Sequence, residues 1–241
     1  MVRILAPFLA VSWLLPLSSQ EVPDEYPRDW AVDILHYRFN ISLSVVSDEI
    51  LGQADVTVLF TEDGVETFAL DLIGRAPGSE TGMNVLRVSR EEHPVQFVHS
   101  GNRVTITLDS SSRSEEQRSY SISYQGTPAD GLIIGTNKWG ERTFFGANWP
   151  DRARHWIPTV DHVSDKATVE WLVTAPEDYE VVGTGTLVER SDLPDGTEFT
   201  HWASHVPIPT KVMVMGAARF AIRTTGYVEG IPIQAWVFPR D

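Results

Sequence analysis

The sequence contains no cysteine, and this absence excludes several kinds of protein. A chain without cysteine has no disulfide framework, so its stability must come from an ordinary apolar core. Cysteine nucleophiles are excluded too, as is a lipid-anchored export signal, which needs a cysteine. With 241 residues and 42% hydrophobic side chains, the chain is long enough for one sizeable domain or two small ones.

Positive charge is also scarce. The sequence has 19 Lys and Arg against 33 Asp and Glu, which gives a formal net charge of −14. A field of that sign repels nucleic acid and anionic membrane surfaces, because both are negatively charged. The composition therefore predicts no nucleic-acid partner.

The common catalytic motifs are missing as well. No histidine is followed by glutamate, so the His-Glu-x-x-His helix of zinc metallopeptidases does not occur, and neither does a Gly-x-Ser-x-Gly elbow. His201 and His205 have the spacing of two zinc ligands on a helix. Their surroundings predict a strand, however, in which their Cα atoms would lie about 13 Å apart. We predict no catalytic or metal-binding residue and interpret this pair as a solvated strand edge.

Residues 1–20 have the layout of a secretory signal peptide. Arg3 provides a positive start, residues 4–17 form an apolar run that contains two prolines, and small and polar residues follow. The run is too short to span a bilayer comfortably, and the prolines disfavour the alternative of a buried N-terminal helix. We expect export to a periplasm or the cell exterior, with no membrane span left in residues 21–241.

The remaining sequence predicts an all-β protein with little helix. Apolar and polar residues alternate, as in half-buried strands, in the segments 37–45, 55–60, 103–108, 119–124 and 167–173. Turn signals occur at residues 62–64, 100–102, 125–126 and 194–196. Short strands at this spacing predict a β-sandwich of packed sheets. Two polar segments, 75–82 and 109–118, are expected to be loops, and a connection between two sheets is expected near one or the other.

One loop, which ends at Asp161, carries the clearest functional signal in the residues themselves. Asn148 and Trp149 offer a carboxamide and a flat apolar face, which suit a small ligand. Arg152 and Arg154 suit an anion clamp. The alternative for Arg154 is a buried ion pair with Asp161, with the tryptophans filling the gap between two sheets. We name Asn148 and Trp149 as candidate substrate-binding residues.

An ordered run of features continues from this loop. It comprises Ala153-Arg154, Ile157-Pro158, Asp161, Lys166, a strand that ends at Pro176, then Pro209-Thr210 and a strand rich in Met and small residues at 213–220. In this order, the chain resembles the N-terminal domain of the aminopeptidase N family of zinc metallopeptidases. The resemblance extends from about residue 34 to residue 237 and is strongest from residue 140 to residue 221.

The resemblance implies a saddle-shaped, mostly antiparallel β domain that packs against a thermolysin-like catalytic domain in cis. That domain would carry the Gly-x-Met-Glu-Asn motif, the zinc helix and the zinc, and neither motif occurs in this sequence. Residues 21–241 would then be the non-catalytic N-terminal domain of an exported aminopeptidase. They would wall the cleft for the N-terminus of a peptide substrate and hold no cofactor. The alternative is a free-standing secreted β-sandwich that binds peptide or carbohydrate.

The resemblance also implies that an acidic or amide side chain of this domain helps to hold the free amine of the substrate. Counted back from Arg154, the Gln or Glu that does so in the family falls at Trp149, and a second polar position falls at Ala147. Neither residue of this sequence matches the family pattern. Asn148 lies between them and would substitute if the loop shifted by one residue, so no site residue transfers securely from the family.

Overall fold

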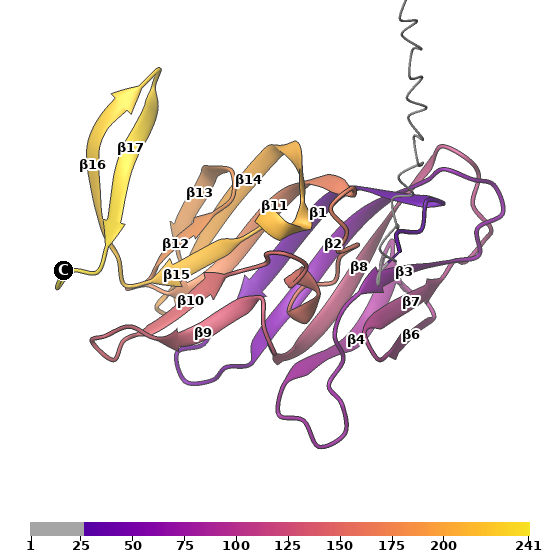
Figure 1. Cartoon of the computed structure of the whole chain (residues 1–241), viewed down its shortest axis with the longest axis horizontal. Helices are drawn as coiled ribbons and strands as arrows, with labels where there is room; N and C mark the ends of the chain where they lie inside the picture. Colours follow the sequence, from indigo (N-terminus) through magenta and orange to yellow (C-terminus); the bar gives the residue numbers. More distant parts are fainter. Residues whose placement is uncertain (1–26) are drawn as a thin grey trace, which may run out of the picture.

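The computed structural model of the chain describes residues 27–241 and is built almost entirely of strands (Figure 1). The predicted signal peptide, residues 1–20, lies outside the described residues. Helix in the described part is confined to two 3-10 turns, η1 (Ala153–His155) and η2 (Thr210–Val212). The strands are β1 Val32–Ser42, β2 Ile50–Phe60, β3 Thr67–Asp71, β4 Gly82–Arg90, β5 His93–Pro94, β6 Phe97–Ser100, β7 Arg103–Thr107, β8 Glu116–Thr127, β9 Leu132–Thr136, β10 Arg142–Gly146, β11 Lys166–Pro176, β12 Glu180–Gly183, β13 Thr186–Asp192, β14 Thr197–Pro209, β15 Met215–Ala218, β16 Ala221–Val228 and β17 Ile231–Val237.

These strands form one large sheet and three smaller ones. The large sheet has eight strands in the order β13-β14-β11-β1-β2-β8-β4-β5, and its neighbours are antiparallel except for β1 and β11. A three-stranded sheet has the order β3-β7-β6, and a four-stranded sheet has the order β12-β15-β10-β9. The hairpin β16-β17 forms a sheet of its own and projects away from the others (Figure 1). The predicted all-β, mostly antiparallel sandwich is confirmed.

The large sheet is hydrophobic on one face because its sequence alternates. In β2, buried and more exposed residues alternate strictly from Ile50 to Phe60, so Val56 and Val58 point inward while Gln53 and Asp55 point outward. Gly52 occupies an inward position beside the ring of Tyr124, where an added Cβ would lie 2.3 Å from Tyr124 Cζ. The glycine therefore makes room for a buried aromatic ring.

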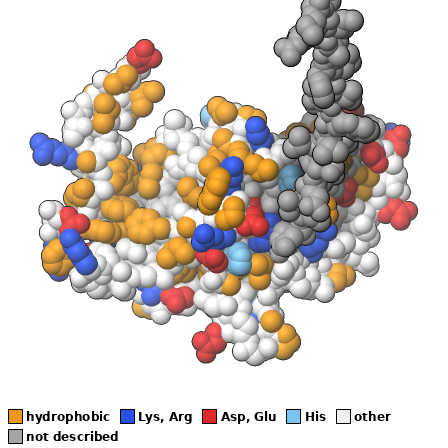
Figure 2. Space-filling model, in the orientation of Figure 1, with side chains coloured by type: hydrophobic (Ala, Val, Ile, Leu, Met, Phe, Trp, Pro, Cys, Tyr) orange, Lys and Arg blue, Asp and Glu red, His pale blue; other side chains and the backbone are white. Residues whose placement is uncertain are grey.

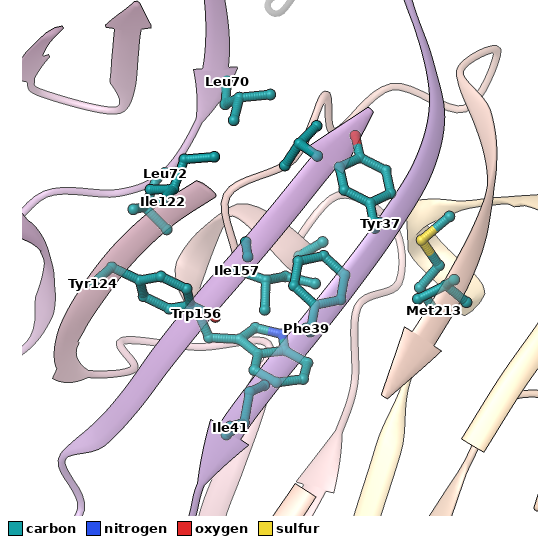
Figure 3. Close-up of a cluster of buried hydrophobic side chains, with 14 of the residues drawn as sticks. Tyr37, Phe39, Ile41, Leu70, Leu72, Ile122, Tyr124, Trp156, Ile157 and Met213 are labelled. Carbon is teal, nitrogen blue, oxygen red and sulfur yellow. The ribbon is translucent and has the colours of Figure 1, made fainter. Parts of the chain in front are cut away.

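One continuous core lies between the large sheet and the elements that cover it. Tyr37, Phe39 and Ile41 of β1 point into it, together with Leu70 of β3 and residues of the loop after β10 (Figure 3). Phe68 of β3 packs against Tyr120 of the large sheet, with ring centroids 5.0 Å apart. Burial of this aromatic and β-branched set, not cross-linking, holds the layers together.

The two predicted loops are present up to their last residues, because Gly82 already belongs to β4 and residues 116–118 already belong to β8. Residues 75–81 lie between β3 and β4, and residues 109–115 lie between β7 and β8, so both loops lead from the three-stranded sheet to the large one. The turns predicted at 62–64, 100–102 and 194–196 are also present. The turn predicted at residues 125–126 is wrong, because both residues lie inside β8. Gly126 is needed there for close packing: an added Cβ would lie 2.2 Å from the carbonyl oxygen of Gly82.

The histidine pair lies on a strand, as predicted, since both residues belong to β14. His201 is paired with β13 on one side and with β11 on the other, so it is not at a sheet edge, whereas His205 lies beyond the end of the pairing with β13. His201 Nε2 lies 3.0 Å from a carboxylate oxygen of Glu170 on β11, whereas His205 is exposed. Within residues 27–241, no group of three or more His, Asp or Glu is arranged to hold a metal ion. A search of the same residues finds no helix with the length and apolarity of a membrane span.

Candidate functional site

The loop after β10 runs through the centre of the core. Trp156 and Ile157 are fully buried beneath the large sheet (Figure 3). The Trp156 ring stacks on Trp171 of β11, with centroids 5.5 Å apart and ring planes 8° from parallel. Gly131 has a φ of +74°, and an added Cβ would lie 2.7 Å from Trp156 Cδ1, so only glycine fits beside this ring. Of the loop's tryptophans, Trp156 fills the gap between layers as predicted.

Asn148 is buried, and its carboxamide bonds within the chain. The Nδ2 group donates to the carbonyl oxygens of Thr210 at 3.1 Å and Met213 at 2.6 Å, while Oδ1 accepts from Trp156 Nε1 at 2.8 Å. These carbonyls belong to the two ends of η2. Asn148 therefore ties the loop to a turn 62 residues further along the chain. Whether Asn148 touches a ligand stays a prediction.

Trp149, the next residue, faces outward with 64% of its surface exposed. The Nζ atom of Lys211 lies 4.5 Å from the centroid of its ring, a cation–π distance. Together with Asp151 and Val163, these two residues line a shallow pocket of about 430 Å³. Its remaining lining includes Arg154 and Asp161, which form the buried side of the pocket.

Arg154 and Asp161 form the buried ion pair that the sequence offered as an alternative. Arg154 Nε lies 3.1 Å from Asp161 Oδ2, and the backbone N–H of Arg154 donates to the same oxygen at 3.2 Å. Asp161 Oδ1 accepts from Thr210 Oγ at 2.6 Å, and Arg152 pairs instead with Asp130 at 3.3 Å. The two arginines thus have separate carboxylate partners, which favours a structural role over an anion clamp.

Burial also shifts the acid–base properties of groups near the loop. It lowers the pKa of His155 below its usual value and raises the pKa of the Tyr37 hydroxyl well above its own. The Tyr37 oxygen accepts a hydrogen bond from the backbone N–H of Val160 at 2.9 Å. Tyr37 therefore stays neutral and serves to hold the end of the loop.

Sequence reasoning missed Lys211 and Thr210 as neighbours of this loop. The segment Pro209-Thr210 belonged to the family resemblance, but nothing in its local pattern indicated contact with Asn148, Trp149 or Asp161. The arrangement as a whole offers an exposed indole, an ammonium group and a hollow of peptide size. It can contact a ligand.

Comparison with known proteins agrees with this architecture. Among solved structures, a two-domain M1 zinc metallopeptidase mutant bound to L-tryptophan is similar, with a TM-score of 0.71, 23% identity, and coverage of 86% of this chain and 47% of that chain. An M1 zinc metallopeptidase from Deinococcus radiodurans gives a TM-score of 0.70, 23% identity, and coverage of 85% and 46%. A mutant from the same organism, bound to a Tyr-Ser-Ala substrate, gives a TM-score of 0.70 and 22% identity, and the match covers 85% of this chain and 46% of that chain.

The chain thus spans less than half the length of these structural neighbours. At such identities, the likeness shows the fold. No match is found among curated proteins. The model of the Peptidase M1 N-terminal domain matches residues 35–212, which include the loop, the buried ion pair and η2. On this match, the chain belongs to the M1 family of zinc metallopeptidases, as an N-terminal domain of that family.

Proposed function

We propose that this chain is the non-catalytic N-terminal domain of an exported zinc aminopeptidase, and that it packs against a thermolysin-like catalytic domain of the same polypeptide. One observation carries the proposal: an uncovered apolar surface, the aromatic band. It consists of Ile133 and Phe145, which are exposed, and of Phe220, Trp236 and Phe238, which are half-buried.

The aromatic band joins the four-stranded sheet to the projecting hairpin. Ile133 and Phe145 lie opposite each other on β9 and β10, and they are 47% and 38% exposed. Phe220 connects them to the hairpin base, with ring centroids 6.1 Å from Phe145 and 5.8 Å from Trp236. Figure 2 shows hydrophobic side chains gathered over this part of the molecule. Contiguous exposed apolar surface of this kind is typical of a protein interface.

The hairpin itself supports a partner. A two-stranded hairpin alone is marginally stable in water, and β16-β17 pairs with no other strand among the described residues. Ile231, Ile233 and Tyr227 on it are 68%, 50% and 69% exposed. The structural neighbours, each about twice as long as this chain, include one named as two-domain, so a catalytic domain in cis is the partner that we propose.

The proposed role in catalysis is to wall the substrate cleft. When bound in the catalytic domain, zinc would polarise the scissile carbonyl and activate water. This chain would contribute Trp149, which contacts the peptide substrate, and Asn148, which supports Trp149 from the core. A direct bond from Asn148 to substrate would require its carboxamide to leave its present partners.

The gene provides the direct test. We expect an open reading frame beyond codon 241 that encodes Gly-x-Met-Glu-Asn followed by His-Glu-x-x-His. An in-frame stop codon at that point would contradict the proposal. The protein expressed from the longer frame should hydrolyse aminoacyl substrates, and it should lose this activity when Ile133 and Phe145 are replaced by Asp.

A further inference from the structure

We propose that Trp149 and Lys211 form a recognition site for peptides that carry a carboxylate, and that Asn148 and Thr210 position this pair. The inference deepens the proposed function, because it names the chemistry of the ligand that the loop receives. It concerns contacts made by this chain alone, so its test does not depend on a catalytic domain.

Lys211 is a cation without a carboxylate partner in the part of the chain that the structure describes. Its Nζ atom lies over the Trp149 ring, and it makes no ion pair with any Asp or Glu of residues 27–241. Other cations around the loop are paired: Arg154 with Asp161 and Arg152 with Asp130. An unpaired ammonium group at the rim of a pocket is suited to a carboxylate.

The pocket adds an apolar contact surface beside this charge. Its volume of about 430 Å³ falls within the range of small-ligand sites. Trp149 and Val163 line it, with 64% and 56% of their surfaces exposed. A short peptide would place its carboxylate at Lys211 and an apolar side chain against the indole.

The two recognition groups are held by buried polar side chains. Asn148 is 1% exposed, and its amide bridges the carbonyls of Thr210 and Met213, which flank Lys211. Thr210 is 2% exposed, and its hydroxyl donates to Asp161 at 2.6 Å. The turn that carries Lys211 is therefore fixed to the loop that carries Trp149. Support of this kind pre-organises a site, because less ordering is left for the ligand to impose.

The test follows the indole N–H signal of Trp149 by NMR in the protein of residues 21–241, with the signal assigned by its loss in Trp149→Phe. Three probes are titrated: the tripeptide Tyr-Ser-Ala, its C-terminal amide, and Tyr-Ser-Glu amide. We expect the free acid to shift the signal and its amide to bind about fivefold more weakly, the factor expected for one exposed ion pair. Restored affinity with Tyr-Ser-Glu amide would show that a side-chain carboxylate serves equally well. If the affinity is not restored, the site recognises the C-terminal carboxylate of the peptide specifically.

Variants separate charge from packing. Lys211→Met should weaken binding of the free acid about fivefold and abolish the preference over the amide, whereas Lys211→Arg should retain it. The matched control is Lys138→Met: Lys138 Nζ lies 5.1 Å from the Trp139 ring centroid, but this lysine is already paired with Asp241 at 2.5 Å. It should leave binding unchanged.

Equal affinity for acid and amide, or no shift of the Trp149 signal with any probe, would overturn the inference. Neither outcome bears on the aromatic band or on the gene downstream of codon 241. Conversely, carboxylate recognition together with a stop codon would leave this inference standing and make the free-standing peptide-binding module the better account of the chain.

Discussion

Arg154 and Asp161 form an ion pair of 3.1 Å whose two side chains are only 2% and 1% exposed. A buried charge that loses its partner is costly, because the low-dielectric interior does not solvate it. Replacing Asp161 with Ala should therefore lower the free energy of unfolding by about 3–5 kcal/mol, as measured by urea denaturation. Asp151, 3.9 Å from Arg154 with its side chain half exposed, provides the control. Asp151→Ala should cost less than about 1 kcal/mol, and equal costs at the two positions would contradict a special role for the pair.

Asn148 makes three buried hydrogen bonds, two as donor and one as acceptor. Asn148→Ala would leave Trp156 Nε1 and two carbonyl oxygens without these partners, so we expect a loss of about 2–4 kcal/mol in unfolding free energy. Asn40→Ala, on the exposed face of β1, should cost under about 0.5 kcal/mol. A neutral Asn148→Ala would favour direct ligand contact as the role of this side chain.

Asp165 should make stability depend on pH. Burial raises the pKa of its carboxyl from 3.8 to about 7; the charge of Arg28, 3.1 Å away, lowers it only in part, and the negative charge of Asp33 adds to the rise. An acid with a raised folded-state pKa contributes stability that is complete below about pH 4 and is lost as the pH rises through 7. Asp165→Asn, which resembles the protonated form, should gain about 1–2 kcal/mol relative to wild type between pH 5 and pH 8.

Urea midpoints across that range would measure the effect of Asp165. The control is Asp195→Asn: hydrogen bonds from Thr197 lower the pKa of this exposed carboxyl, so its effect should be constant above pH 5. If the difference in unfolding free energy between wild type and Asp165→Asn were also constant with pH, the predicted pKa shift would be refuted.

The aromatic band should bind a dye that reports exposed apolar surface. We expect the double variant Ile133→Thr, Phe145→Thr to reduce dye fluorescence and aggregation without loss of unfolding free energy, because both side chains lie on the outer face of their sheet. Leu51→Thr is the matched control, since Leu51 is 56% exposed on the polar face of β2. A similar decrease in fluorescence in both proteins would mean that the band is not a distinct surface.

The chain of 241 residues should neither retain zinc after dialysis nor hydrolyse aminoacyl substrates. The reason is that residues 27–241 bring together no group of metal-binding side chains and the sequence contains no His-Glu-x-x-His. Metal analysis and a fluorogenic aminopeptidase assay would measure both. Bestatin-sensitive hydrolysis by the purified chain would contradict this prediction.

Much of this architecture follows from local sequence. The alternation in residues 55–60 and 119–124 predicts strands because the side chains of an extended backbone point to opposite faces every second residue. The Arg154–Asp161 ion pair could also be predicted as one of two alternatives for Arg154, since the partners lie seven residues apart in one loop. Residues 125–126 misled the interpretation because a glycine required for close strand packing looks like a glycine required for a turn.

The sequence by itself therefore determined that the chain is all-β and has neither disulfides nor a catalytic motif. These properties can be recognised from local residue patterns and from their periodicity. Only the tertiary structure decided that Asn148 turns inward while Trp149 turns outward, and that Lys211 meets the indole. Those outcomes depend on hydrogen bonds to Thr210 and Met213, 62 and 65 residues away. Such partners become neighbours only after the sheets have packed, because burial selects which polar groups must be satisfied within the chain.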